Sequence, residues 1–219
     1  MTGNPEAHSA LERLCRDYYG PVKAFLHSRR FPTQDVEDFT HDFFSELVKT
    51  HAWKRADRTQ GRFRTFLLAI LLHVIGRHRE RAQALKRGSA LTESFEELAE
   101  AGFEVAASPQ DTSVFDREWA LVLMENTVRA VERSFAQTER SAQWEVLCRF
   151  LPGSGEAPTY EEAAAQLGIS LAAVKSGVHR LRLQFREELR FAVARTVGAA
   201  HEVDEELAYL HRVLTSAEG

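Results

Sequence analysis

Two sets of charged side chains in this 219-residue chain have the residue types and spacing to bind ions of opposite sign. The basic set recurs every three or four positions: Lys175, His179, Arg182 and Arg186. The acidic set has the same spacing: Asp35, Asp38, Asp42 and Glu46. Residues three or four apart share one face of a helix. The first set is therefore suited to phosphate groups and the second to a basic partner.

No residues have the spacing of a catalytic or metal site. The nine histidines are scattered, and no HExxH, CxxC or glycine-rich phosphate loop occurs. Cys15 and Cys148 are far apart, which argues against a disulfide framework and favours a reducing compartment. We expect a chain without enzymatic activity, catalytic residues, cofactor or metal.

Helical periodicity predicts the elements that position the two charged sets. Few prolines occur and no strand-like alternation is seen, so the sequence predicts an all-α fold. Pro32 interrupts the pattern, and Thr33 is expected to cap the helix that follows. Gly20-Pro21 is expected to kink or split the first helix. The predicted helices cover residues 6–29, 34–50, 62–86, 116–135, 138–151 and 203–214, with two more flanking Gly168.

The stretch TYEEAAAQLGISLAAVKSGVHRLR predicts two helices joined by a glycine turn. Thr159 and Glu162 form a capping-box pattern, and Gly168 can end the first helix in the left-handed conformation. Ile169 is expected to pack inward and Ser170 to cap the second helix. A buried stripe is predicted at Val174, Val178, Leu181 and Phe185. This arrangement is typical of a helix-turn-helix that enters the major groove of DNA.

Charge is divided into blocks along the chain, although its net value is only −4. Residues 54–87 carry ten Lys and Arg and two acids, whereas residues 92–118 carry eight acids and one Arg. Residues 170–195 are basic again, and the tail from residue 200 is acidic. Two basic blocks separated by an acidic one indicate two anion-binding surfaces.

The helix-turn-helix stretch closely resembles region four of small bacterial sigma factors of the extracytoplasmic-function type. Two further stretches, DVEDFTHDFFSELV and FRTFLLAILLHVIGRHRERA, resemble region two of the same family. The resemblance covers most of residues 8–192 and implies two helical domains joined by an acidic linker. The implied boundaries are region two at 1–88, the linker at 89–115, region four at 116–192 and a C-terminal helical extension at 193–219.

In this family, the acidic face of region two docks on the clamp of the largest catalytic subunit of core RNA polymerase. Region four contacts the other large subunit and reads the minus-35 promoter element. The resemblance therefore implies these polymerase-binding residues: Asp35, Asp38, Asp42, Phe43, Phe44 and Leu47. The notable alternative is that the three apolar residues belong to the core.

The resemblance also implies promoter DNA as a partner, with region two melting the minus-ten element. Expected DNA-binding residues of region two are Arg62, Arg64, His73, Arg77 and Arg81. Those of region four are Thr159, Ser170, Lys175, Ser176, His179, Arg180, Arg182 and Arg186. The chain departs from the family at Ala69, Leu72, His73 and Gly177, where contacts are expected to be lost.

Several expectations concern control and alternatives. Thr40 lies within the acidic stripe and is a candidate for phosphorylation, with a protein kinase or an anti-sigma factor as an additional partner. The free chain is expected to be a cytoplasmic monomer without membrane insertion. The alternative functions are a helix-turn-helix DNA-binding regulator, or a degenerate sigma-like protein, that does not engage polymerase. The tail is expected to cap the second domain or recruit a regulator.

Overall fold

The computed structural model describes residues 5–51, 62–86, 109–138 and 140–216. All regular elements in these ranges are helical, which agrees with the predicted fold class. Contacts divide the chain into unit 1, residues 1–122 and 196–219, and unit 2, residues 123–195. Residues 89–108 of the predicted linker lie outside the described residues.

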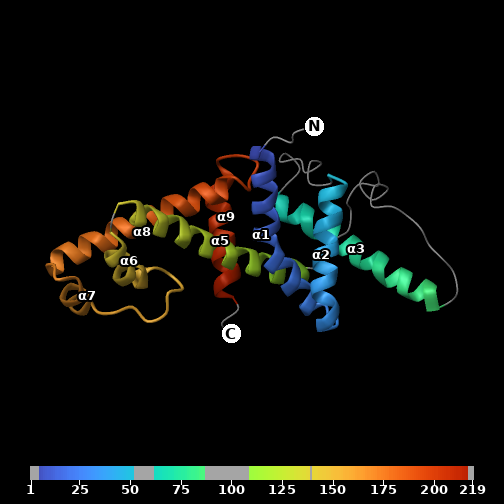
Figure 1. Ribbon diagram of the computed structural model, residues 1–219, viewed down its shortest axis with the longest axis horizontal. Coiled ribbons are helices and arrows are strands. Elements are labelled where there is room, and N and C mark those ends of the chain that lie inside the picture. Colours follow the sequence, from blue (N-terminus) through green and yellow to red (C-terminus); the bar gives the residue numbers. More distant parts are fainter. Residues whose placement is uncertain (1–4, 52–61, 87–108, 139, 217–219) are drawn as a thin grey trace. The chain divides into compact units, whose positions relative to one another are not determined.

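Unit 1 begins with three helices: α1 (Pro5–Ser28), α2 (Thr33–Lys49) and α3 (Phe63–Lys86). Pro21 lies within α1, which continues through it as a single helix. α2 begins at Thr33 itself, and no side chain caps it, so the predicted Thr33 cap is wrong. α1 and α2 pack together, as Figure 1 shows.

Apolar side chains from each of these helices form the core of unit 1. The longest contribution comes from α3, whose Leu67, Leu68, Ile70, Leu71 and Ile75 are all buried. Val22, Phe25 and Leu26 of α1 are fully buried as well. The apolar residues of these three helices therefore pack together as one core.

Two later segments complete unit 1. α5 (Pro109–Gln137) begins six residues before the predicted end of the linker and contributes its first half to this unit, with Phe115 buried. α9 (Glu202–Thr215) belongs to unit 1 through buried Val203 and Leu210. The expectation that the tail caps the second domain is therefore wrong.

Unit 2 contains the rest of α5, α6 (Ser141–Leu147), the short 3-10 helix η3 (Cys148–Phe150), α7 (Tyr160–Leu167) and α8 (Leu171–Ala194). Its core includes the buried aromatic residues Phe135, Trp144, Phe150 and Phe185. Among the described helices, none is long and apolar enough to cross a membrane.

Candidate nucleic-acid and protein interfaces

The start of α7 is fixed by the predicted capping box. Thr159 Oγ1 accepts a hydrogen bond from the Glu162 amide at 3.2 Å, and the Thr159 amide donates to the Glu162 carboxylate at 2.8 Å. The hydrogen bond from the Thr159 amide, with a contribution from the Thr159 side chain, lowers the pKa of the Glu162 carboxyl, because the charged carboxylate is the better acceptor. Two amides at the helix start are thereby satisfied by local residues.

The turn between α7 and α8 is also set by local geometry. Gly168 has φ of 64°, the left-handed conformation that glycine adopts most easily. The Gly168 amide donates to the Ala165 carbonyl, and the Ile169 amide donates to the Ala164 carbonyl. This pair of bonds is a Schellman motif. The Ile169 side chain is 37 % exposed, however, so the prediction that it packs inward is wrong.

α8 buries one stripe and exposes another. Ser170 caps it by accepting a hydrogen bond from the Ala173 amide, as predicted. The predicted stripe is buried: Val174, Val178, Leu181 and Phe185. The predicted DNA-binding side chains of this helix are exposed: Lys175, Ser176, His179, Arg180, Arg182 and Arg186. A helix that anchors one face in its domain and presents cations on another can lie against DNA.

Two of these cations also make contacts within unit 2. The Arg182 guanidinium donates two hydrogen bonds to the Phe150 carbonyl, at 3.2 and 3.3 Å. Lys175 lies over the ring of Tyr160, with 5.9 Å from Nζ to the ring centroid. Arg182 therefore ties α8 to η3, and this role was not predicted.

Gly177 lies at a close approach between helices. A Cβ atom placed there would meet Leu147 Cδ1 of α6 at 3.3 Å. The resemblance to sigma factors implies that a DNA contact made at this position in the family is absent here, because the residue is glycine. The structure instead places this position against a buried leucine of unit 2.

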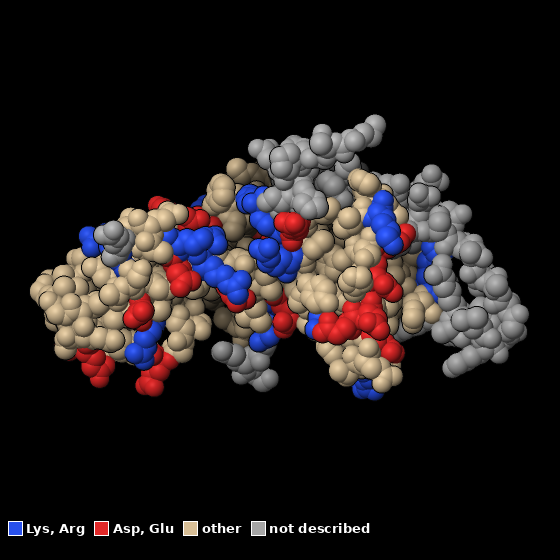
Figure 2. Space-filling view, in the orientation of Figure 1, with Lys and Arg blue, Asp and Glu red and all other residues tan. Residues whose placement is uncertain are grey.

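The acidic stripe of α2 is at the surface, where Asp35, Asp38 and Asp42 are all exposed. Figure 2 shows acidic side chains gathered over this helix. On α2, Glu37 accepts a hydrogen bond from the Tyr19 hydroxyl at 2.8 Å and forms an ion pair with Lys23. The Lys23 and Tyr19 hydrogen bonds lower the pKa of the Glu37 carboxyl. Three aspartates thus remain on the surface as the sequence predicted.

The other residues assigned to this interface are not at the surface. Phe43, Phe44 and Leu47 are at most 6 % exposed, which confirms the alternative that they belong to the core of unit 1 and not to a polymerase contact. Thr40 is completely buried, and its hydroxyl donates to the Val36 carbonyl at 2.7 Å. A kinase cannot reach a buried hydroxyl, so the folded chain does not support Thr40 as a phosphorylation site.

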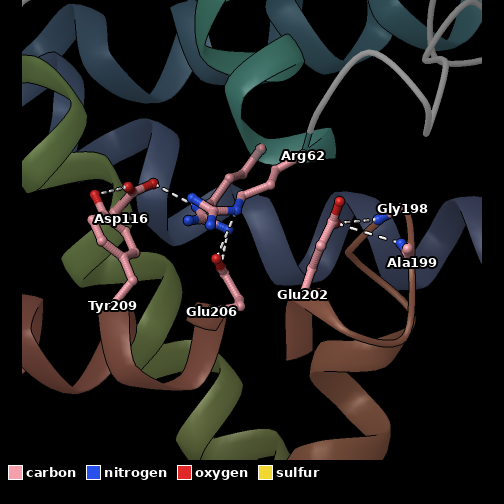
Figure 3. Close-up of polar contacts among 8 residues, drawn as sticks. Arg62, Asp116, Gly198, Ala199, Glu202, Glu206 and Tyr209 are labelled. Atoms are coloured by element: carbon pink, nitrogen blue, oxygen red, sulfur yellow. Dashed lines mark hydrogen bonds and ion pairs between the residues drawn. The ribbon is translucent and has the colours of Figure 1, made fainter. Parts of the chain in front are cut away.

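A buried ionic cluster in unit 1 joins three helices. Arg64 at the start of α3 is 2 % exposed, and its Nε lies 2.7 Å from the Asp116 carboxylate of α5. Its Nη1 donates to the fully buried Glu206 of α9. Arg62 Nε lies 2.6 Å from the second carboxylate oxygen of Glu206. Figure 3 shows Arg62 and Asp116 converging with Glu206 and Tyr209, the last two both from α9.

Aromatic groups enclose this ionic cluster. The Tyr209 hydroxyl donates to Asp116 at 2.5 Å, and burial together with this bond raises the pKa of Tyr209 to about 12. The Arg64 guanidinium lies over the Trp119 ring, 4.9 Å from its centroid. Burial disfavours the charged form of Arg64, but Asp116 and Glu206 outweigh it and raise the pKa of Arg64.

The cluster corrects the predicted DNA-binding set of region two. Arg64 is buried between two carboxylates, so its prediction as a DNA contact is wrong for this conformation. Arg62 is paired, although 35 % of its side chain remains exposed. His73 and Arg77 are half-buried and take part in other interactions, and the side chain of Arg81 lies outside the described residues. Because Arg64 is buried, the structure does not place the predicted region-two residues together on one surface.

Sequence reasoning missed Asp116, Glu206 and Tyr209. One signal was present for Glu206, which lies at helical spacing between Val203 and Leu210 on the apolar face of α9. A carboxylate at a core-facing position requires a buried partner. Nothing in the sequence identified that partner, because Arg64 and Glu206 are 142 residues apart.

Across the residues with described side chains, no group of three or more His, Cys, Asp or Glu is arranged to hold a metal ion. Cys15 and Cys148 are both free thiols and half-buried. Burial raises the pKa of each thiol, which disfavours a reactive thiolate.

No family model, curated protein or solved structure matches the chain. The resemblance to small sigma factors therefore stays a prediction from the quoted motifs.

Proposed function

We propose that the chain is a transcription initiation factor of the small bacterial sigma-factor type. In this role it binds core RNA polymerase through α2, selects promoter DNA through α8 and helps to open it. The polymerase performs the chemistry, and this chain contributes binding energy alone. A cytoplasmic location belongs to the same proposal.

The observation that carries the proposal is the geometry of α7 and α8. A capped short helix, a left-handed glycine and a second helix with exposed cations are the parts that a helix-turn-helix requires, and they support the proposal. In this motif the first helix crosses the DNA backbone and the N-terminal part of the second contacts base edges. Arg180 and Arg186 have exposed side chains with which to contact phosphates.

The exposed aspartates of α2 support the polymerase part of the proposal. Asp35, Asp38 and Asp42 project from a helix whose opposite residues are fixed in the core of unit 1. A rigid row of carboxylates complements a basic protein surface. A DNA-binding regulator that never meets polymerase would need the α8 face but would leave this row unexplained.

The deciding experiment is run-off transcription with core RNA polymerase and a library of promoter sequences. We expect initiation that depends on this chain, together with its co-elution with the core enzyme. Binding to DNA without co-elution would favour the regulator instead. Failure of both binding and initiation would overturn the proposal.

A paired variant tests the α2 surface. Asp38→Asn combined with Asp42→Asn is expected to weaken binding to core polymerase by about twofold to 30-fold, because each of the two exposed ion pairs contributes roughly 0.2–1 kcal/mol. The matched control, Glu161→Gln with Glu205→Gln, removes two exposed acids elsewhere and should leave binding unchanged. Equal effects of the two pairs would contradict the assignment of α2.

A second variant tests α8. Arg180→Ala is expected to reduce the salt dependence of DNA binding by about one phosphate contact. Arg129→Ala removes an exposed cation that pairs with Glu125 on α5 and serves as the control. An unchanged salt slope for Arg180→Ala would exclude this side chain as a phosphate contact.

A further inference from the structure

α9 is attached to unit 1 through both apolar and polar contacts. Among its residues, only Val203 and Leu210 are buried apolar side chains. The remaining buried residue is Glu206, which is paired with Arg62 and Arg64. By comparison, α2 buries Val36, Phe43, Phe44 and Leu47 in the same unit. Polar contacts therefore account for a larger share of the attachment of α9 than of α2.

The ion pairs that hold α9 can be replaced by ion pairs between the same arginines and another anion. Placing two charges in a protein interior costs desolvation free energy that offsets much of their attraction. A helix held by ion pairs is therefore sensitive to any anion that can take the place of its carboxylate. Arg62 is the accessible end of the cluster, since 35 % of its side chain is exposed whereas Arg64 is enclosed.

The start of α9 has the charge of a competing anion. Its first turn carries Glu202, Asp204 and Glu205, and Glu206 follows directly. A DNA phosphate offers Arg62 the same oxygen chemistry as the Glu206 carboxylate. Arg62 and the Glu206 carboxylate, which takes the place of a phosphate, thus both lie in unit 1.

We propose that α9 is an autoinhibitory latch, in which Glu206 occupies Arg62 and withholds it from DNA. Release of α9 frees the Arg62 guanidinium for a phosphate contact, while Arg64 keeps Asp116 as its partner. The latch rests on the proposed DNA-binding function and adds a control step to it. It predicts that the free chain binds DNA more weakly than its exposed cations would allow.

The test compares two isosteric variants of the full chain, Glu206→Gln and Glu205→Gln. Each changes the net charge by the same amount, but only Glu206 is paired with Arg62 and Arg64, while Glu205 is exposed. Glu206→Gln is expected to accelerate amide hydrogen exchange across residues 202–215 by about tenfold or more, because α9 opens more often. It should also raise affinity for a short DNA duplex of arbitrary sequence at low salt by roughly threefold over Glu205→Gln.

A third variant assigns the gain to Arg62. Adding Arg62→Gln to Glu206→Gln should abolish the increase in DNA affinity while α9 stays fast to exchange. If the increase persists, it does not come from Arg62 and the latch is refuted. Equal behaviour of Glu206→Gln and Glu205→Gln refutes it as well.

The same measurements separate the latch from a purely structural role of α9. Exchange protection of α1 and α2 must survive in Glu206→Gln, and its loss would show that α9 holds unit 1 together and overturn the latch. A chain that initiates transcription with core polymerase but fails these comparisons loses the latch alone. A chain that binds no DNA in any variant loses both the latch and the proposed DNA-binding role.

Discussion

Units 1 and 2 use arginine in opposite ways. In unit 2, α8 anchors itself through an apolar stripe and leaves Arg180 and Arg186 exposed. In unit 1, Arg64 is enclosed by Asp116, Glu206 and Trp119. Both regions are basic in sequence, yet Arg180 and Arg186 are exposed whereas Arg64 is buried. Whether an arginine can contact DNA therefore depends on whether the fold places carboxylates beside its guanidinium group.

The two units also differ in the range of the contacts that shape them. The α7–α8 turn is made by Thr159, Glu162, Gly168 and Ser170, whose polar contacts reach no further than four residues. The ionic cluster of unit 1 joins residues 52 and 142 positions apart. Substitutions at the α7–α8 turn should accordingly act through local geometry, and those in the ionic cluster through distant partners.

The largest expected effect is in the ionic cluster. Arg64→Ala leaves two buried carboxylates without their shared cation, which should lower the free energy of unfolding of unit 1 by about 3–5 kcal/mol. Arg180→Ala, at an exposed position, should change stability by no more than about 0.5 kcal/mol. Urea denaturation monitored by circular dichroism gives both values, and hydrogen exchange assigns the loss to unit 1. Similar changes in the free energy of unfolding for the two variants would contradict the difference between buried and exposed arginines.

A smaller effect is expected at the turn of unit 2. Gly168→Ala places a Cβ on a residue with φ of 64°, which should destabilise the α7–α8 pair by about 1–2 kcal/mol. DNA affinity should fall with it, because the turn sets the orientation of α8. Thermal unfolding and DNA binding measure the two consequences. An unchanged melting temperature would mean that the turn relaxes without cost.

Gly76 in α3 provides the opposite case. A Cβ there meets no heavy atom within 4 Å, and the position is exposed within a helix. Gly76→Ala should therefore stabilise unit 1 by about 0.5–1 kcal/mol through helix propensity alone. The same denaturation experiment measures it. Destabilisation would show that local propensity does not operate at this site in unit 1.

The smallest expected effect is on the stability of the Thr159–Glu162 capping box of α7, which should depend on pH. The pKa of Glu162 is lowered in the folded chain from its ordinary 4.5, so its contribution is fully present above that value and is lost as the pH falls through the folded pKa. The Thr159 amide should then exchange faster with solvent. NMR titration can follow both residues. Glu162→Gln keeps an acceptor that does not titrate, so its cap should be independent of pH over this range.

The sequence predicted the local structure of the described residues well. Helix α1 was expected at 6–29 and occupies Pro5–Ser28, and α9 was expected at 203–214 and occupies Glu202–Thr215. The sequence also predicts the buried stripe of α8 and the polar stripe beside it that carries the exposed cations. These features depend on periodicity and on caps formed by neighbouring residues.

The domain boundaries required the structure. The residues 116–122 assigned to the second domain lie in unit 1, and so do residues 196–219. Phe115 and Trp119 continue the same helical pattern as the rest of α5, so nothing in the periodicity distinguishes the two halves. Which half joins which core is decided by contacts with distant helices.

The sequence by itself determined the bounds of α1 and α9 to within one residue, which face of α8 is apolar and which residues close its turn. Those properties depend on groups a few positions apart along the chain. Only the tertiary structure decided that Arg64 is buried, that Phe43 belongs to the core and that Thr40 is inaccessible. A side chain's pairing and burial depend on what distant segments place beside it, and Glu206 reaches Arg64 only when α9 docks on unit 1.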